Sequence, residues 1–220
     1  MNNWFKLCPR VPWVPPDQAD PDGFVGLGGN LHPPSLLRAY CEGIFPWFNE
    51  GDPILWWSPH PRAIFEIDRF HISRRFARTL RSGKFQITFN RDFAAVIRGC
   101  AVREEGTWIT ASMMKAYEHL HQLGHAHSVE SWVDGELTGG VYGISIGAFF
   151  AAESMFYRQT DGSKAALTGL VGRLRERGFE LLDTQFVTEH TRSLGATEIS
   201  RAAYLSRLRT AIQRQDVTFA

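Results

Sequence analysis

The sequence predicts a mixed α/β protein in two parts. Its first sixty or so residues are rich in proline, glycine and tryptophan, and alternating strand and helix patterns begin at Ala63. Pro59 and Pro61 interrupt both kinds of periodicity, so the boundary falls near residues 58–62. We therefore expect a small N-terminal domain over residues 1–60 and a larger domain over residues 61–220, built on a mixed, partly antiparallel central sheet.

Composition narrows the class of protein. Of the 220 residues, 44% are hydrophobic and 21% are charged, which is typical of a globular chain and not of a disordered one. The formal net charge of +1 gives no support to wholesale coating of nucleic acid. Cys8, Cys41 and Cys100 follow no pattern, which disfavours both a disulfide framework and a zinc ribbon.

The sequence predicts neither a membrane span nor a secretion signal. The longest uncharged apolar run, residues 141–152, contains Gly143 and Gly147 and is shorter than the ~18 residues of a spanning helix. The N-terminus has no apolar segment behind basic residues, so we expect a cytoplasmic protein.

Local patterns define the expected elements in order. A helix over 35–42 follows Pro33 and Pro34 and ends at Gly43. Short apolar runs predict strands, and helical spacing of apolar residues predicts helices. These elements are a strand at 63–67, a helix at 73–81, a strand at 85–89, and helices at 91–100 and 112–123.

The second half of the chain is expected to supply the centre of the sheet. Residues 127–145 alternate as two strands around Asp134-Gly135, a strong signal for a tight hairpin, and the second strand is expected to continue through GISIGAFF. A helix over 163–177 ends at Gly178, a buried strand covers 179–186, and a last helix covers 201–214.

One stretch of the larger domain is basic. Seven arginines and lysines lie between residues 69 and 91, and the one acidic residue set against them is the adjacent Asp68. This stretch is either a solvated helix face or a phosphate-binding face. The cations are Arg69, Arg74, Arg75, Arg78, Arg81, Lys84 and Arg91.

Two familiar kinds of site are disfavoured. Among the clustered histidines 119, 121, 125 and 127, the pair His121 and His125 spans the helix stop Gly124, so no metal is expected. Covalent catalysis is also disfavoured, because none of the cysteines has a patterned context with histidine.

The run that starts at Arg158 resembles a coenzyme A pyrophosphate loop at a helix start. Gln159 and Gly162 fit that loop, but Lys164 replaces its last small residue. An ordinary capped helix start explains the run equally well.

Polar groups in apolar strands and tryptophans beside turns are the strongest candidates. Glu153 follows an apolar strand, and Asp183 and Gln185 are expected on one face of another. Buried polar groups need partners or a function, so a structural network and an active site both remain open. Trp47 and Trp108 lie beside proline and glycine, where an adenine base could stack.

An ordered set of motifs then points to one family. The set spans about Gly26 to Arg201 and comprises GLGGNL, YCEGIFPWF, GDPILWWSPHPR, REEGTWIT, LGHAHSVE, GGVYGISIGAFFAAESMFYR, SKAAL and LLDTQFVTEHTRSLGA. Together these motifs resemble the leucyl/phenylalanyl-tRNA–protein transferases.

The resemblance implies a fold and a reaction. The fold would be a small N-terminal domain followed by a GNAT-like acyltransferase domain. The reaction would move leucine or phenylalanine, with methionine as a further donor, from aminoacyl-tRNA to the N-terminal arginine or lysine of a protein. That product is marked for degradation by the N-end rule. The resemblance also implies no metal, no coenzyme A and no other cofactor.

The resemblance also implies roles for residues. Asp183 and Gln185 match the pair that assists deprotonation of the acceptor amine, and Glu153 matches an acidic residue near that amine. Trp47 and Trp108 match residues that meet the terminal adenosine. Tyr40 and Tyr117 match further tyrosines near that end of the tRNA. The matches to the apolar amino-acid pocket are Val141, Phe150, Leu170 and Leu174. Here valine replaces the usual methionine and leucines replace phenylalanines, and Thr188 stands where an asparagine is familiar.

Elementary chemistry agrees with that reaction. An aminoacyl ester is already activated, and a terminal amine with a pKa of ~7.7–8.0 is partly unprotonated at neutral pH. We therefore interpret Asp183 as orienting Gln185, whose carbonyl accepts from the amine. Arg78 and Arg81 would meet tRNA phosphates. The alternatives are a GNAT-like acyl-coenzyme A transferase and a non-catalytic module that binds RNA or protein N-termini.

Overall fold

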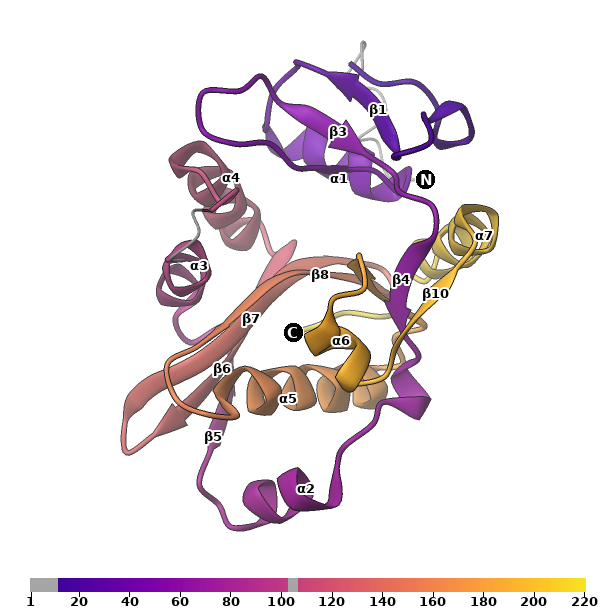
Figure 1. Cartoon of the computed structure of the whole chain (residues 1–220). Helices are drawn as coiled ribbons and strands as arrows, with labels where there is room; N and C mark the ends of the chain where they lie inside the picture. The colour runs from indigo at the N-terminus through magenta and orange to yellow at the C-terminus, as the bar shows by residue number, and fades with distance from the viewer. Residues whose placement is uncertain (1–11, 103–106) are drawn as a thin grey trace.

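The structure, a computed structural model, describes residues 12–102 and 107–220 and contains two β-sheets flanked by helices (Figure 1). Cys8 and the first four residues of the REEGTWIT motif lie outside the described residues. The described helices include none with the length and apolar character needed to cross a membrane.

The N-terminal part contains a small antiparallel sheet and one helix. Strands β1 (Phe24–Leu27), β3 (Leu55–Trp57) and β2 (Phe45–Pro46) lie in the order β1-β3-β2 beside α1 (Pro33–Cys41), and a 3₁₀ turn, η2, covers Pro16–Gln18. Trp56 is fully buried, packs 4.6 Å from the Trp13 ring and donates from its indole to Gly28 O. The helix was predicted, whereas the strands are two to four residues long and too short to show a period.

The larger sheet has seven strands in the order β10-β4-β9-β8-β7-β6-β5. Only β8 and β9 run parallel, and the other neighbours are antiparallel, so the predicted mixed sheet is confirmed. Its strands are β4 (Arg62–Phe65), β5 (Gln86–Phe89), β6 (Ala126–Val133), β7 (Glu136–Ile146), β8 (Phe149–Tyr157), β9 (Leu181–Gln185) and β10 (Ala196–Ile199).

Helices cover both faces of this sheet (Figure 1). Gly139 of β7 approaches the start of α5 on one face, and its neighbour Gly140 meets Val96 of α3 on the other. The helices are α2 (Arg74–Arg81), α3 (Phe93–Ala101), α4 (Ala111–Gln122), α5 (Gly162–Arg177), α6 (Glu189–Ser193) and α7 (Arg201–Ala211), with a 3₁₀ turn, η3, over Ile67–Arg69. The helices expected from spacing are therefore confirmed, and only α6 was missed because of its length.

The hairpin between β6 and β7 is confirmed, but the expected continuation through GISIGAFF is wrong. Asp134 and Gly135 both have positive φ, 51° and 83°, as a two-residue hairpin turn requires. The second strand ends at Ile146 and turns at Gly147, which has φ 55°, before it returns as β8. A Cβ at Gly147 would lie 2.7 Å from Ala211 O, so the glycine allows this turn to pack against the end of α7.

The contact between β7 and α5 generates a stability prediction. A Cβ at Gly139 would lie 2.4 Å from the backbone carbon of Gly162, so Gly139→Ala should lower the free energy of unfolding by about 1–3 kcal/mol. The control is Gly172→Ala on the exposed side of α5, where nothing lies within 4 Å. It should raise that free energy by about 0.5–1 kcal/mol, since alanine favours helix. Equal effects in urea unfolding would contradict the close packing of β7 on α5.

Candidate active site

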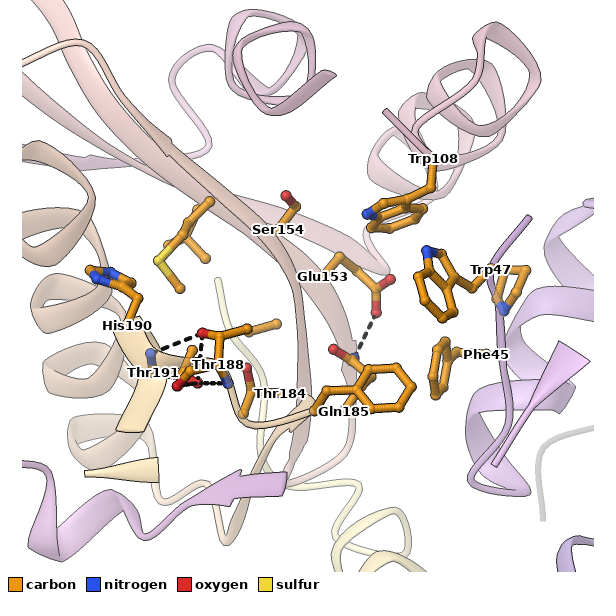
Figure 2. Close-up of a pocket in the computed structure, with 15 residues that line it drawn as sticks. Phe45, Trp47, Trp108, Glu153, Ser154, Thr184, Gln185, Thr188, His190 and Thr191 are labelled. Carbon is orange, nitrogen blue, oxygen red and sulfur yellow. Dashed lines mark hydrogen bonds between the residues drawn. The ribbon is translucent and has the colours of Figure 1, made fainter. Parts of the chain in front are cut away.

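A pocket opens where the two parallel strands part. Strands β8 and β9 pair from Phe149 with Leu181 to Ala151 with Asp183, and then they diverge. The space between them is a pocket of about 370 Å³ (Figure 2). Its lining residues are Phe45, Pro46, Trp47, Trp108, Val141, Ala152, Glu153, Ser154, Met155, Thr184, Gln185, Phe186, Thr188, His190 and Thr191.

Two β-bulges aim the polar side chains into this gap. The pairing of β7 with β8 steps from Tyr142–Ser154 to Gly143–Ala152, so Glu153 is the extra residue. The pairing of β4 with β9 steps from Ala63–Gln185 to Ile64–Asp183 and skips Thr184. A bulge turns a side chain away from the regular alternation, and here both bulges border the pocket.

A buried ion pair lies behind the pocket. Arg62 is 1% exposed and Asp183 is 0% exposed. The Arg62 Nε donates to Asp183 Oδ1 at 2.8 Å, and NH2 donates to Oδ2 at 2.6 Å. Tyr204 of α7 donates to Oδ2 at 3.1 Å, and Arg62 NH1 donates to Gly43 O at 3.2 Å. Burial alone would lower the pKa of Arg62, but Asp183 outweighs burial and keeps that pKa above its usual value.

Asp183 reaches Gln185 through the backbone. The Gln185 N–H donates to Asp183 Oδ1 at 3.0 Å, and Gln185 has φ 55°, in the left-handed region. Because of this φ and the bulge at Thr184, the alternation that would place both side chains on one face does not apply. Gln185 lines the pocket, whereas Asp183 lies beneath Arg62 and Tyr204. Asp183 therefore positions the Gln185 main chain and does not touch its amide group.

Glu153 faces the pocket and is bonded to buried tyrosines. The Tyr117 hydroxyl donates to Glu153 Oε2 at 3.1 Å and lies 2.5 Å from the Tyr40 hydroxyl. Burial raises the pKa of Glu153 to about 8, and Asp183 adds to this effect, while the two tyrosine hydroxyls and Arg62 oppose it. Tyr40 and Tyr117, which the resemblance placed near the end of the tRNA, are both fully buried. Their hydroxyls lie against each other and against Glu153.

Aromatic side chains form one wall of the pocket. Trp47 is 43% exposed, and its ring lies 5.6 Å from Phe186 and 6.0 Å from Trp57. Trp108 stands across from Trp47 and beside Glu153 (Figure 2). The structure thus brings together the two predicted tryptophans. Phe45 and Phe186 complete the wall and carried no sequence signal.

Of the four residues predicted to form the amino-acid pocket, one lines the observed pocket and three lie in the core. Val141 lines it, whereas Phe150, Leu170 and Leu174 are buried in the core. The Phe150 ring packs 5.4 Å from Phe219 of the C-terminal segment. Met155, His190 and Thr191 also line the pocket, although the sequence did not single them out. Thr188, which the resemblance noted, lines it too and caps α6.

The basic segment lies elsewhere on the protein. Arg78 and Arg81 are exposed on α2, which lies at the opposite end from the N-terminal sheet (Figure 1). Arg75, Arg78 and Lys84 line a shallow hollow of about 480 Å³ together with Asp161. The structure therefore does not bring Arg78 and Arg81 to the pocket.

The clustered histidines and the loop at the start of α5 pack against neighbouring residues. His121 stacks on Phe93 and His127 stacks on Phe219, at centroid distances of 4.4 and 4.5 Å. In residues 12–102 and 107–220, no three metal-ligating side chains converge. At the start of α5, a Cβ on Gly162 would lie 2.4 Å from Thr138 O, so β7 closely packs the loop that resembles a coenzyme A site.

A buried carboxyl and an amide that line one aromatic pocket in a mixed α/β fold indicate the class of protein, an enzyme. Comparisons with known proteins identify the family. The family model described as Leucyl/phenylalanyl-tRNA protein transferase matches residues 64–209, and the model of that family's N-terminal domain matches residues 29–60. The chain belongs to the leucyl/phenylalanyl-tRNA–protein transferase family.

Curated relatives that carry this name are similar over most of their length. The protein from Syntrophotalea carbinolica is 47% identical over 94% of this chain and 92% of its own. The protein from Salmonella heidelberg is 52% identical over 86% of this chain and 81% of its own. Among solved structures, a ribosomal-protein-alanine N-acetyltransferase from Brucella melitensis is 23% identical over 50% of this chain and 87% of that chain, with a TM-score of 0.36.

The buried ion pair generates a prediction. Arg62→Met should lower the free energy of unfolding by about 3–5 kcal/mol, because it leaves the Asp183 carboxylate buried without its cation. The matched variant Tyr204→Phe removes a single hydroxyl from the same carboxylate and should cost about 0.5–1.5 kcal/mol. Denaturant unfolding measures both. A smaller loss for Arg62→Met than for Tyr204→Phe would refute the dependence of the site on this pair.

Proposed function

We propose that this enzyme transfers leucine or phenylalanine from aminoacyl-tRNA to the N-terminal arginine or lysine of proteins. One observation carries the proposal: a single pocket is lined by an aromatic wall, by the polar pair Glu153 and Gln185, and by the apolar Val141 and Met155. Glu153 and Gln185 lie between the tryptophans and His190 (Figure 2). Such a lining matches an aminoacyl-adenosine, which has a flat base, an ester and an apolar side chain. Membership of the family supports the same reaction.

The reaction requires placement more than a strong base. The ester is activated by its link to the tRNA, and a terminal amine with a pKa of ~7.7–8.0 is partly free at neutral pH. Holding the amine and the ester together then supplies much of the acceleration. Gln185, fixed by the Asp183 contact, and Glu153 flank the place where the two would meet.

Each region of the pocket takes part of the substrate in this proposal. Trp47 and Trp108 stack on the terminal adenine. Val141 contacts the donor side chain, with Phe150, Leu170 and Leu174 as the packed layer behind it. Tyr40 and Tyr117 act through Glu153, which lies beside the place of the acceptor amine. No cofactor takes part, and the reaction takes place in the cytoplasm, where charged tRNA is made.

One assay tests the proposal directly. Labelled phenylalanine on tRNA should pass to a peptide that begins with arginine, and pretreatment of the charged tRNA with ribonuclease should lower that transfer, because it removes the contacts to the tRNA body. A peptide that begins with alanine is the matched acceptor and should be used far less, because it lacks the cationic side chain that arginine and lysine share. Acetyl transfer from acetyl-coenzyme A in place of this activity would favour the acyl-coenzyme A alternative.

Arg78 and Arg81 should contact the tRNA body. Their exposed position on α2 suits phosphate contacts, each of which adds ~0.7–0.9 to the slope of log affinity against log salt. The double variant Arg78→Ala with Arg81→Ala should therefore weaken binding of full-length charged tRNA and flatten that slope. It should leave binding of an aminoacyl-adenosine analogue unchanged.

Trp47→Ala is the matched variant at the pocket. Base stacking on an aromatic ring is worth ~1–3 kcal/mol and depends little on salt, so this variant should weaken both ligands at an unchanged salt slope. Filter binding over a salt series measures both effects. Unaltered tRNA affinity in the double arginine variant would move the RNA contact to another surface, such as that of α7.

A further inference from the structure

Two backbone carbonyls decide how the Gln185 amide is oriented. They are Ala152 O and Thr184 O, next to the bulges of β8 and β9. When the amide nitrogen faces them, it donates to Thr184 O at 3.2 Å and to Ala152 O at 3.1 Å. When the amide is turned over, the nitrogen donates to Glu153 Oε1 at 3.3 Å, and the amide oxygen is left against the two carbonyl oxygens. The first orientation gives the amide nitrogen two acceptors. The second places the amide oxygen against two other oxygen acceptors, which is unfavourable.

The favoured orientation places a demand on Glu153. The Gln185 oxygen then occupies the position 3.3 Å from Glu153 Oε1, and two oxygen acceptors attract each other only through a shared proton. The Glu153 carboxyl is the group that can carry that proton. Its other oxygen, Oε2, accepts from Tyr117, which leaves Oε1 as the protonated atom.

We propose that Glu153 is a neutral carboxyl in the resting enzyme and donates its proton from Oε1 to Gln185 Oε1, with Tyr117 and Tyr40 as positioning residues that reserve Oε2 as an acceptor. Hydrogen bonds then run in one direction, from Tyr40 through Tyr117, Glu153 and Gln185 to the carbonyls of Ala152 and Thr184. In this run of hydrogen bonds, no acceptor faces another acceptor and no donor faces another donor.

The surrounding charges support a neutral carboxyl. Among the described residues, the ionisable groups that face Glu153 are Tyr40 from α1, Tyr117 from α4, Asp183 from β9 and Arg62 from β4. Arg62 forms a bidentate pair with Asp183, so its charge mainly neutralises the Asp183 carboxylate and not Glu153. Burial raises the pKa of Glu153 to about 8, in agreement with the hydrogen-bond pattern.

A neutral Glu153 gives the transfer step a proton balance, and this part of the inference rests on the proposed function. As the amine forms its C–N bond, the ester C–O bond breaks, and the departing 3′ oxygen needs one proton. Glu153 supplies that proton and becomes a carboxylate. The carboxylate then takes the proton that the new amide nitrogen loses, so the enzyme returns to its starting form and no net proton is consumed.

The first test measures the protonation state without any substrate. Carbon-13 NMR of the full chain labelled at glutamate carboxyls, with Glu153→Gln used to assign the resonance, should show Glu153 protonated at pH 7 and titrating near pH 8. Tyr117→Phe should raise that pKa, because the hydroxyl stabilises the carboxylate. Tyr204→Phe is the control, because it removes a buried hydroxyl that bonds to Asp183. It should leave the pKa of Glu153 near the wild-type value. An ionised Glu153 at pH 7 would overturn the proposal.

The second test follows transfer. The kcat for transfer to an arginine peptide should fall as pH rises through about 8, since Glu153 then loses the required proton. Tyr117→Phe should move only this limb to higher pH, and the limb set by the acceptor amine should stay in place. Glu153→Gln keeps a donor toward Gln185 Oε1, so it should fold like wild type yet lose at least tenfold in kcat with little change in KM.

These two tests separate the inference from the proposed function. If the carboxyl titrates near pH 8 but no transfer from charged tRNA occurs, the protonation state stands and the proposed function fails. If transfer occurs and Glu153→Gln keeps the wild-type kcat, the proposed function stands and the proton role of Glu153 is refuted.

Discussion

The site depends on one buried ion pair. Arg62 and Asp183 join β4 to β9, and their other hydrogen bonds reach Gly43 of the N-terminal part and Tyr204 of α7. Such a pair adds little net stability, because both charges lose their hydration, but removal of one partner is costly. Its value here lies in position, because the same carboxylate holds the backbone of Gln185 in the left-handed region at the edge of the pocket.

The pocket exists because the parallel pairing of β8 and β9 is short. After Ala151 and Asp183 the strands separate, and bulges turn Glu153 and Gln185 toward the gap. The N-terminal part supplies Phe45 and Trp47 to the opposite wall. A single space therefore combines residues from both parts of the chain, and disturbing the ion pair would change the main chain, the bulge and the pocket wall together.

Local patterns in the sequence predicted most of the regular elements. Asp134-Gly135 identified a hairpin and Gly178 ended α5 in the left-handed conformation, because these turns depend on adjacent residues. The strands of the N-terminal part and the turn at Gly147 were not found, since they are short or depend on packing against α7. The sequence identified Glu153, Asp183 and Gln185 as polar residues in apolar strands. It gave no sign of the two bulges or of the role of Arg62. The bulge in β9 and the Arg62–Asp183 pair depend on contacts between segments more than a hundred residues apart.

The most direct test of this account is a crystal structure of the full chain with a non-hydrolysable phenylalanyl-adenosine, in which an amide replaces the ester. Adenine should lie against Trp47 and Trp108, the linking carbonyl between Glu153 and Gln185, and the phenyl ring near Val141. The Arg62–Asp183 pair should be unchanged beneath them. An adenosine bound elsewhere, or a linking carbonyl out of reach of both Glu153 and Gln185, would contradict the account.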